Sequence, residues 1–174
     1  LGDPNAPVVI QEFSDFGCIH CADFAFETKK MLEEEYIKTG KVYLEFHSVG
    51  GLLSSYATLQ AAEAAYCAGD QGAFWQFHDL VFLNQTTLFT NRSADNTNKL
   101  VKIAGILDLD ENQFQQCLVN RTYLNQTAMD ESTARSYGIT GTPAFMVNGF
   151  LLSGNQPIEN FRQVIDGALE ADTE

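Results

Sequence analysis

The chain of 174 residues contains no apolar run that approaches the ~20 residues needed by a membrane-spanning helix. It is also poor in cationic residues, with 10 Lys and Arg against 23 Asp and Glu and a formal net charge of −13. A charge of this sign repels the phosphates of nucleic acids and disfavours docking on anionic membrane surfaces. No internal repeat or low-complexity segment is present. We therefore expect a globular protein that is long enough for a hydrophobic core and an inserted subdomain, and that has no nucleic-acid partner.

Cysteine is scarce, and its placement limits what the thiols can do. Cys18 and Cys21 form the single C-x-x-C motif, whereas Cys67 and Cys117 lie fifty residues apart. A structural zinc site would need two more ligands at suitable spacing, and no second C-x-x-C exists. We therefore expect no metal site and no cofactor. A structural disulfide and a redox-active pair both remain open for Cys18 and Cys21. One close pair and one distant pair are consistent with an oxidising compartment.

The order of apolar patterns predicts a mixed α/β fold. Strands are expected at residues 8–13, 42–46, 144–148 and 150–153. Helices are expected at residues 22–39, 54–68, 73–83, 97–105, 110–119, 122–137 and 158–171. The strand, helix and strand at the start predict a parallel crossover unit. A helical block at 53–138 is thus inserted into an α/β domain made of residues 1–52 and 139–174.

The C-x-x-C motif stands between the first strand and the first helix. Cys18 is therefore expected at a helix N-terminus, where free N–H groups and the helix dipole favour an anion. The thiolate is the form that carries out thiol–disulfide chemistry, so this position predicts a redox site.

Two further features support a redox site. Pro143 stands directly ahead of the third strand, in a segment that resembles the cis-proline loop of the thioredoxin superfamily. This resemblance implies a cis peptide, which would present the backbone of Thr142 to an extended substrate. Glu12 lies within an apolar strand, six residues before Cys18. Burial of a carboxyl group raises its pKa, which would make Glu12 a proton acceptor for Cys21. An ordinary loop proline and a glutamate at a strand edge are the alternatives.

These residues together resemble the DsbA-like thiol:disulfide oxidoreductases of the thioredoxin superfamily. The similar segments are GDPNAPVVIQEFSDFGC at 2–18, AAEAAYC at 61–67, GAFWQFHD at 72–79 and GTPAF at 141–145. The resemblance covers essentially the whole chain. It implies a thioredoxin fold with a helical insertion between the second and third strands.

The resemblance also implies roles for single residues. Cys18 matches the exposed nucleophile, Cys21 the buried resolving thiol, and Glu12 the buried acid of the first strand. His20 matches the histidine before the second cysteine, and we expect its side chain to set the oxidising power. Thr142 and Pro143 match the substrate-binding cis-proline loop. In the implied oxidising compartment, Cys67 and Cys117 are expected to form a structural disulfide, with two buried free thiols as the alternative.

Two departures leave the direction of electron flow open. Ile19 stands where oxidising members typically have proline, and threonine before the cis-proline is also found in isomerase-type relatives. The leading hypothesis is an oxidase that introduces disulfides into secreted or cell-envelope proteins. A reductase or isomerase and a thioredoxin-fold chaperone or metallochaperone are the alternatives.

The implied setting is extracytoplasmic, either periplasmic or in the cell envelope. The implied partners are unfolded or reduced protein substrates and a membrane redox partner. Because Leu1 is not an initiator methionine, we expect upstream residues, which could include a signal peptide or a membrane anchor.

Overall fold

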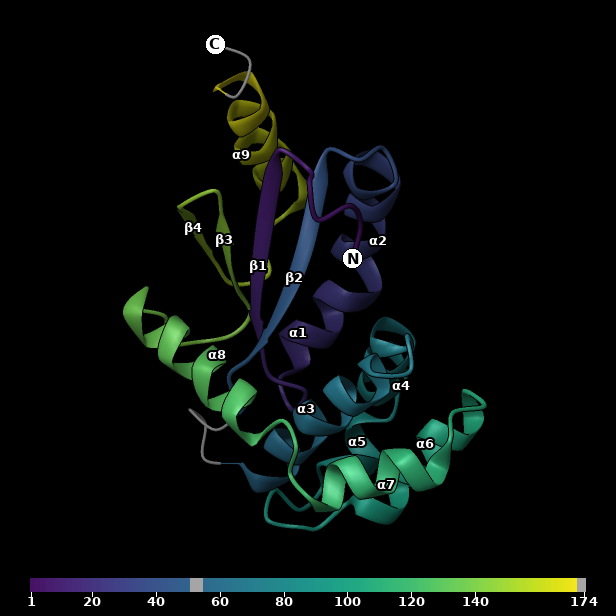
Figure 1. The fold of residues 1–174 in the computed structure, drawn as a ribbon. Coiled ribbons are helices and arrows are strands. Elements are labelled where there is room, and N and C mark those ends of the chain that lie inside the picture. Colours follow the sequence, from purple (N-terminus) through teal and green to yellow (C-terminus); the bar gives the residue numbers. More distant parts are fainter. Residues whose placement is uncertain (51–54, 172–174) are drawn as a thin grey trace. The chain divides into compact units, whose positions relative to one another are not determined.

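The computed structural model describes residues 1–50 and 55–171 and shows a mixed α/β fold (Figure 1). The predicted fold class is confirmed. Contacts divide the chain into two compact units. Unit 1 contains Leu1–Ser14, Cys18–His47 and the chain from Ile139 onward, and unit 2 contains Asp15–Gly17 and Ser48–Gly138. The boundary predicted between residues 52 and 53 lies outside the described residues, so the proposed domain limits stay a prediction.

Unit 1 is built on a four-stranded sheet. Its strands are β1 (Val8–Ser14), β2 (Val42–Ser48), β3 (Ala144–Val147) and β4 (Phe150–Ser153), in the order β2-β1-β3-β4. β3 is antiparallel to both β1 and β4. The strand predicted at 144–148 ends one residue early because Asn148 has φ +43 and Gly149 has φ +92. Two residues with positive φ form the tight turn that matches the twist of a β-hairpin.

The helix that follows β1 carries the C-x-x-C motif. It consists of α1 (Ile19–Asp23), η1 (Phe24–Thr28), α2 (Lys29–Leu32) and η2 (Glu33–Ile37), where η1 and η2 are π-helical turns. The helix begins three residues earlier than predicted because Cys18, with φ −88 and ψ 124, is its N-cap. Each π-helical turn shifts the helix face that the following residues present.

The core of unit 1 lies between the sheet and two helical segments. The ring of Phe145 on β3 lies 4.4 Å from that of Phe24 and 4.9 Å from that of Phe161 on α9 (Ile158–Ala171). The carboxylate of Glu35 also accepts hydrogen bonds from Nε and Nη2 of Arg162 at 2.7 and 2.5 Å. These contacts fix α9 against the helix that carries the cysteines.

Unit 2 is helical. Its elements are α3 (Tyr56–Gly69), α4 (Phe74–Leu83), α5 (Gln85–Leu88), α6 (Thr97–Ile106), α7 (Glu111–Val119) and α8 (Leu124–Ser136). Cys67 on α3 and Cys117 on α7 form a disulfide, with Cα atoms 5.9 Å apart. Asp130 on α8 accepts hydrogen bonds from the Ser48 N–H at 3.1 Å and the Tyr66 hydroxyl at 2.5 Å. In the described part of the chain, no helix has the length and apolar character needed to span a membrane.

Candidate active site

The sulfur of Cys18 caps the helix that it precedes. The backbone N–H of Cys21 donates a hydrogen bond to Cys18 Sγ at 3.3 Å. Cys18 is partly exposed, whereas Cys21 is completely buried. An accessible first thiol and a protected second thiol are suited to attack by a substrate thiol at Cys18.

A loop far away in sequence lies against the Cys18 sulfur. The Thr142–Pro143 peptide bond is cis, and the thiol of Cys18 donates a hydrogen bond to the Thr142 carbonyl oxygen at 3.5 Å. Pro143 is buried and Thr142 is partly exposed. The structure thus brings the predicted site residues Thr142 and Pro143 next to Cys18.

The environment of Cys18 favours its thiolate. A hydrogen bond with the Cys21 thiol is the largest influence and lowers the pKa of Cys18. Burial opposes this effect, whereas Thr142 and the backbone N–H groups of Cys21 and His20 add to it. The balance lowers the pKa of Cys18 to about 6. At neutral pH the thiol is then largely in its reactive form.

Glu12 lies on the sheet face that the cysteine-bearing helix covers. It pairs with Phe145 across the β1–β3 ladder, so both side chains point to the same face. The ring of Phe145 packs against Phe24, three residues after Cys21. Glu12 is fully buried there. Its position is consistent with the predicted acid beneath the thiol pair, and its proton-transfer role stays a prediction.

The two residues between the cysteines are exposed. Ile19 exposes 60% of its surface beside Cys18. The imidazole of His20 has its Nδ1 atom 3.4 Å from Oδ2 of Asp23. It is the backbone of His20, rather than its ring, that contributes to the low pKa of Cys18. Sequence reasoning missed Asp23, although its spacing of three residues from His20 in a helix is the signal for such a contact.

A family model described as thioredoxin matches residues 1–167. The chain belongs to the thioredoxin family. Crystallised alpha-DsbA1 from Wolbachia pipientis is 28% identical to this thioredoxin-family chain, with a TM-score of 0.85 over 100% of this chain and 93% of that one. The predicted DsbA-like resemblance is therefore confirmed.

Curated relatives of this thioredoxin-family chain include longer proteins. "Na(+)/H(+) antiporter NhaA 3" of Salinispora tropica is 35% identical over 91% of this chain, which spans only 22% of that protein. "Probable disulfide bond formation protein D" of Bacillus cereus is 28% identical over 98% of this chain and 78% of its own length.

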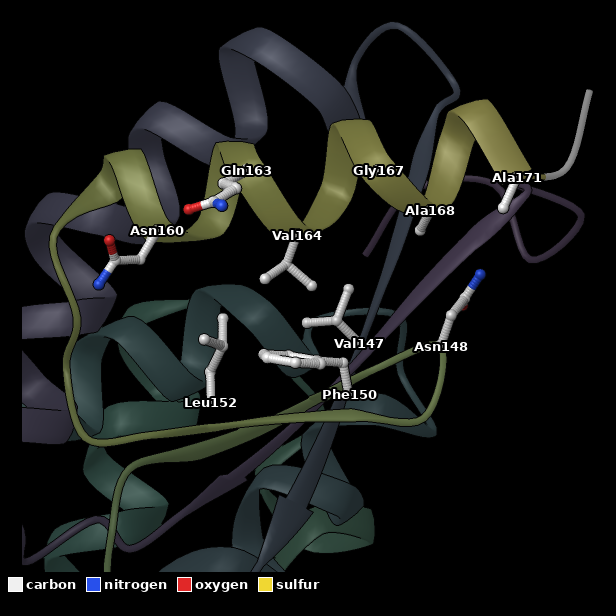
Figure 2. A pocket seen from close by; sticks show the side chains of 10 residues that line it. All are labelled: Val147, Asn148, Phe150, Leu152, Asn160, Gln163, Val164, Gly167, Ala168 and Ala171. Carbon is white, nitrogen blue, oxygen red and sulfur yellow. The ribbon is translucent and has the colours of Figure 1, made fainter.

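Unit 1 of this thioredoxin-family chain also has a groove between its C-terminal hairpin and α9, with a volume of about 790 Å³ (Figure 2). Its lining residues include Val147, Leu152 and Val164, with the amides of Asn148, Asn160 and Gln163. None of its ten lining residues carries a thiol, imidazole or carboxyl group. Among residues 1–50 and 55–171, no three His, Cys, Asp or Glu side chains gather in a group that could hold a metal ion. The chemistry is therefore expected at Cys18.

Proposed function

We propose that the chain is a thiol:disulfide oxidoreductase that introduces disulfides into secreted or cell-envelope proteins. One observation carries the proposal. The accessible thiol of Cys18 has a pKa lowered to about 6 and lies beside both Cys21 and the Thr142 backbone. A stabilised thiolate makes Cys18 a good leaving group when a disulfide is passed on.

The reaction begins with a disulfide between Cys18 and Cys21. A substrate thiolate attacks Sγ of Cys18, the Cys18–Cys21 bond breaks, and Cys21 departs as a thiolate that takes up a proton. A second substrate thiolate then attacks the substrate sulfur of the mixed disulfide. The substrate disulfide forms, and Cys18 departs as a thiolate. Two electrons have passed from the substrate to the protein.

The surroundings of the thiols suggest the remaining roles. Buried Glu12 would accept or return the Cys21 proton, while exposed Ile19 and the Thr142–Pro143 loop would contact an extended, unfolded or reduced substrate. A membrane redox partner would reoxidise the dithiol. The expected setting is extracytoplasmic, where disulfides persist.

The Cys18 pKa also indicates how oxidising the site is. In thioredoxin a reactive cysteine with a pKa of ~7 accompanies a reduction potential of ~−270 mV. In DsbA a cysteine pKa of ~3.5 accompanies a reduction potential of ~−120 mV. At ~30 mV per pKa unit, a pKa of about 6 corresponds to roughly −240 to −195 mV. Structural disulfides have reduction potentials below about −300 mV, so a site in this range still oxidises the dithiols from which they form.

The decisive experiment mixes the oxidised protein with a reduced peptide that contains two cysteines. We expect stoichiometric disulfide formation in the peptide and no transfer by Cys18→Ala. In the reverse reaction, the Cys18 thiolate of Cys21→Ala attacks the disulfide of the oxidised peptide, releases one peptide thiol, and leaves a mixed disulfide that no Cys21 thiol can resolve. A measured potential near −270 mV, with reduction of oxidised peptides as the faster reaction, would instead establish the reductase alternative.

A further inference from the structure

The histidine of the C-x-x-C motif is held by an acid of its own helix. Nδ1 of His20 lies 3.4 Å from Oδ2 of Asp23, with 70% of the His20 side chain and 46% of the Asp23 side chain exposed. Asp23 is the last residue of α1, and Cys18 is the N-cap of that helix. The contact therefore directs the ring toward the C-terminal end of α1, away from the residue whose thiolate a cation would stabilise.

We propose that Asp23 is a positioning residue that restrains the oxidising power of the Cys18–Cys21 pair by holding the imidazole of His20. The proposal rests on the dithiol/disulfide cycle proposed above. In this proposal the His20 ring can stabilise the Cys18 thiolate, but it does not do so while it contacts Asp23.

Two features of the site support this assignment. His20 assists the Cys18 thiolate through its backbone N–H, which remains in place whichever way the ring turns. The first turn of α1 contains no acidic residue, so Asp23 is the acid of this short helix that the ring can meet. A hydrogen bond to one ring nitrogen also fixes which nitrogen carries the proton.

Release of the ring should favour the reduced state. A ring free to approach the sulfur stabilises the thiolate of the reduced site, and the disulfide has no such charge to stabilise. Loss of Asp23 should therefore make the pair more oxidising. Exposed ion pairs are weak, so we expect about a threefold change in the equilibrium with glutathione, equivalent to about 14 mV.

The experiment measures that equilibrium for the wild type, Asp23→Ala, Asp23→Glu and Glu27→Ala. In the reaction the Cys18–Cys21 bond breaks while two glutathione thiols are oxidised to one glutathione disulfide. Cys21 takes up one of the two glutathione protons, and the other is released to solvent when Cys18 remains a thiolate. Glu27 is the matched control, because it is an exposed acid one turn further along the same helix. We expect Asp23→Ala to favour the dithiol about threefold, Asp23→Glu to remain near wild type, and Glu27→Ala to change the equilibrium less than 1.5-fold.

A His20→Ala background separates positioning from charge alone. If Asp23 acts through the ring, Asp23→Ala changes the equilibrium less than 1.5-fold when His20 is absent. A full threefold effect without His20, an equal effect of Glu27→Ala, or no effect of Asp23→Ala would each overturn the proposal. The ratio of each variant's equilibrium constant to that of the wild type does not depend on the direction of electron flow in the cell. A wild type that acts as a reductase would therefore refute the oxidase function, and the role of Asp23 could still be tested.

Discussion

The thiol of Cys18 lies 3.5 Å from the carbonyl oxygen of Thr142, a residue 124 positions further along the chain. β3, which begins two residues after Thr142, pairs with β1, and β1 leads into the loop that ends at Cys18. The sheet thus places the two parts of the site together. In the proposed function, a backbone carbonyl beside the reactive sulfur would also give an extended substrate a hydrogen-bonding partner.

Replacement of Thr142 by valine should raise the pKa of Cys18. A hydrogen bond from the Thr142 side chain is one of the influences that lower this pKa, and valine has a similar shape without the hydroxyl group. We expect a rise of about one unit, measured from thiolate absorbance during a pH titration of the reduced protein. Thr140→Val is the control, because Thr140 is exposed in the same loop. An unchanged pKa in Thr142→Val would remove Thr142 from the account of thiolate stabilisation.

The low pKa of Cys18 should make the stability of the reduced protein depend on pH. The folded pKa is about 6 and the ordinary value is 9.0, so the folded state binds the proton more weakly. The stabilisation is therefore complete above about pH 9 and is lost as the pH falls to about 6. Three units correspond to ~4 kcal/mol, which we reduce to ~2 kcal/mol because the sulfur is partly exposed.

This dependence can be measured by urea unfolding of reduced wild type and reduced Cys18→Ala at pH 5, 7 and 9. Both proteins lose the Cys67–Cys117 bond under reductant, so that loss cancels. The wild type should gain stability relative to the variant as the pH rises. A difference that stays flat or shrinks with rising pH would contradict the lowered pKa.

Replacement of Glu12 by glutamine should slow the step in which Cys21 gains or loses its proton. Glu12 is fully buried on the sheet face covered by the cysteine-bearing helix, and glutamine preserves its shape without the ability to carry a proton. General acid–base groups contribute ~10²–10⁴-fold, so we expect at least a tenfold loss in the rate at which Cys21 resolves a mixed disulfide.

Stopped-flow measurement of that rate has a matched control in Glu45→Gln. Glu45 accepts a hydrogen bond from the Gln11 side chain, and Gln11 is on the opposite face of β1 from Glu12. The control should behave as wild type. Equal rates in all three proteins would leave Glu12 with a purely structural role.

Removal of the Cys67–Cys117 disulfide should destabilise the protein without abolishing thiol exchange at Cys18. The bond closes a loop with a sequence separation of 50, for which loop-closure entropy gives a loss of about 4 kcal/mol. The measurement is urea unfolding of the Cys67→Ala/Cys117→Ala variant under non-reducing conditions. Unchanged stability would show that the bond does not constrain the unfolded chain.

Much of the fold could be predicted because its signals are local. β4 and α9 occupy the predicted residues, and Asp110 caps α7 by accepting hydrogen bonds from the N–H groups of Asn112 and Gln113. The predicted start of the helix near the cysteines was wrong by three residues. The C-x-x-C motif has no apolar periodicity, and its helical conformation depends on the N-cap at Cys18. α5 was missed because four residues form too short a pattern to recognise.

The sequence by itself determined the chemistry available to this protein. A single C-x-x-C between a strand and a helix, an acid within that strand and a proline ahead of a later strand indicated a redox site, because each signal depends on neighbouring residues alone. Only the tertiary structure decided how these groups act on one another. The approach of Thr142 to Cys18, the face on which Glu12 is buried and the turn of His20 toward Asp23 depend on strand pairing, packing and rotamers, which bring together atoms whose positions no local pattern records.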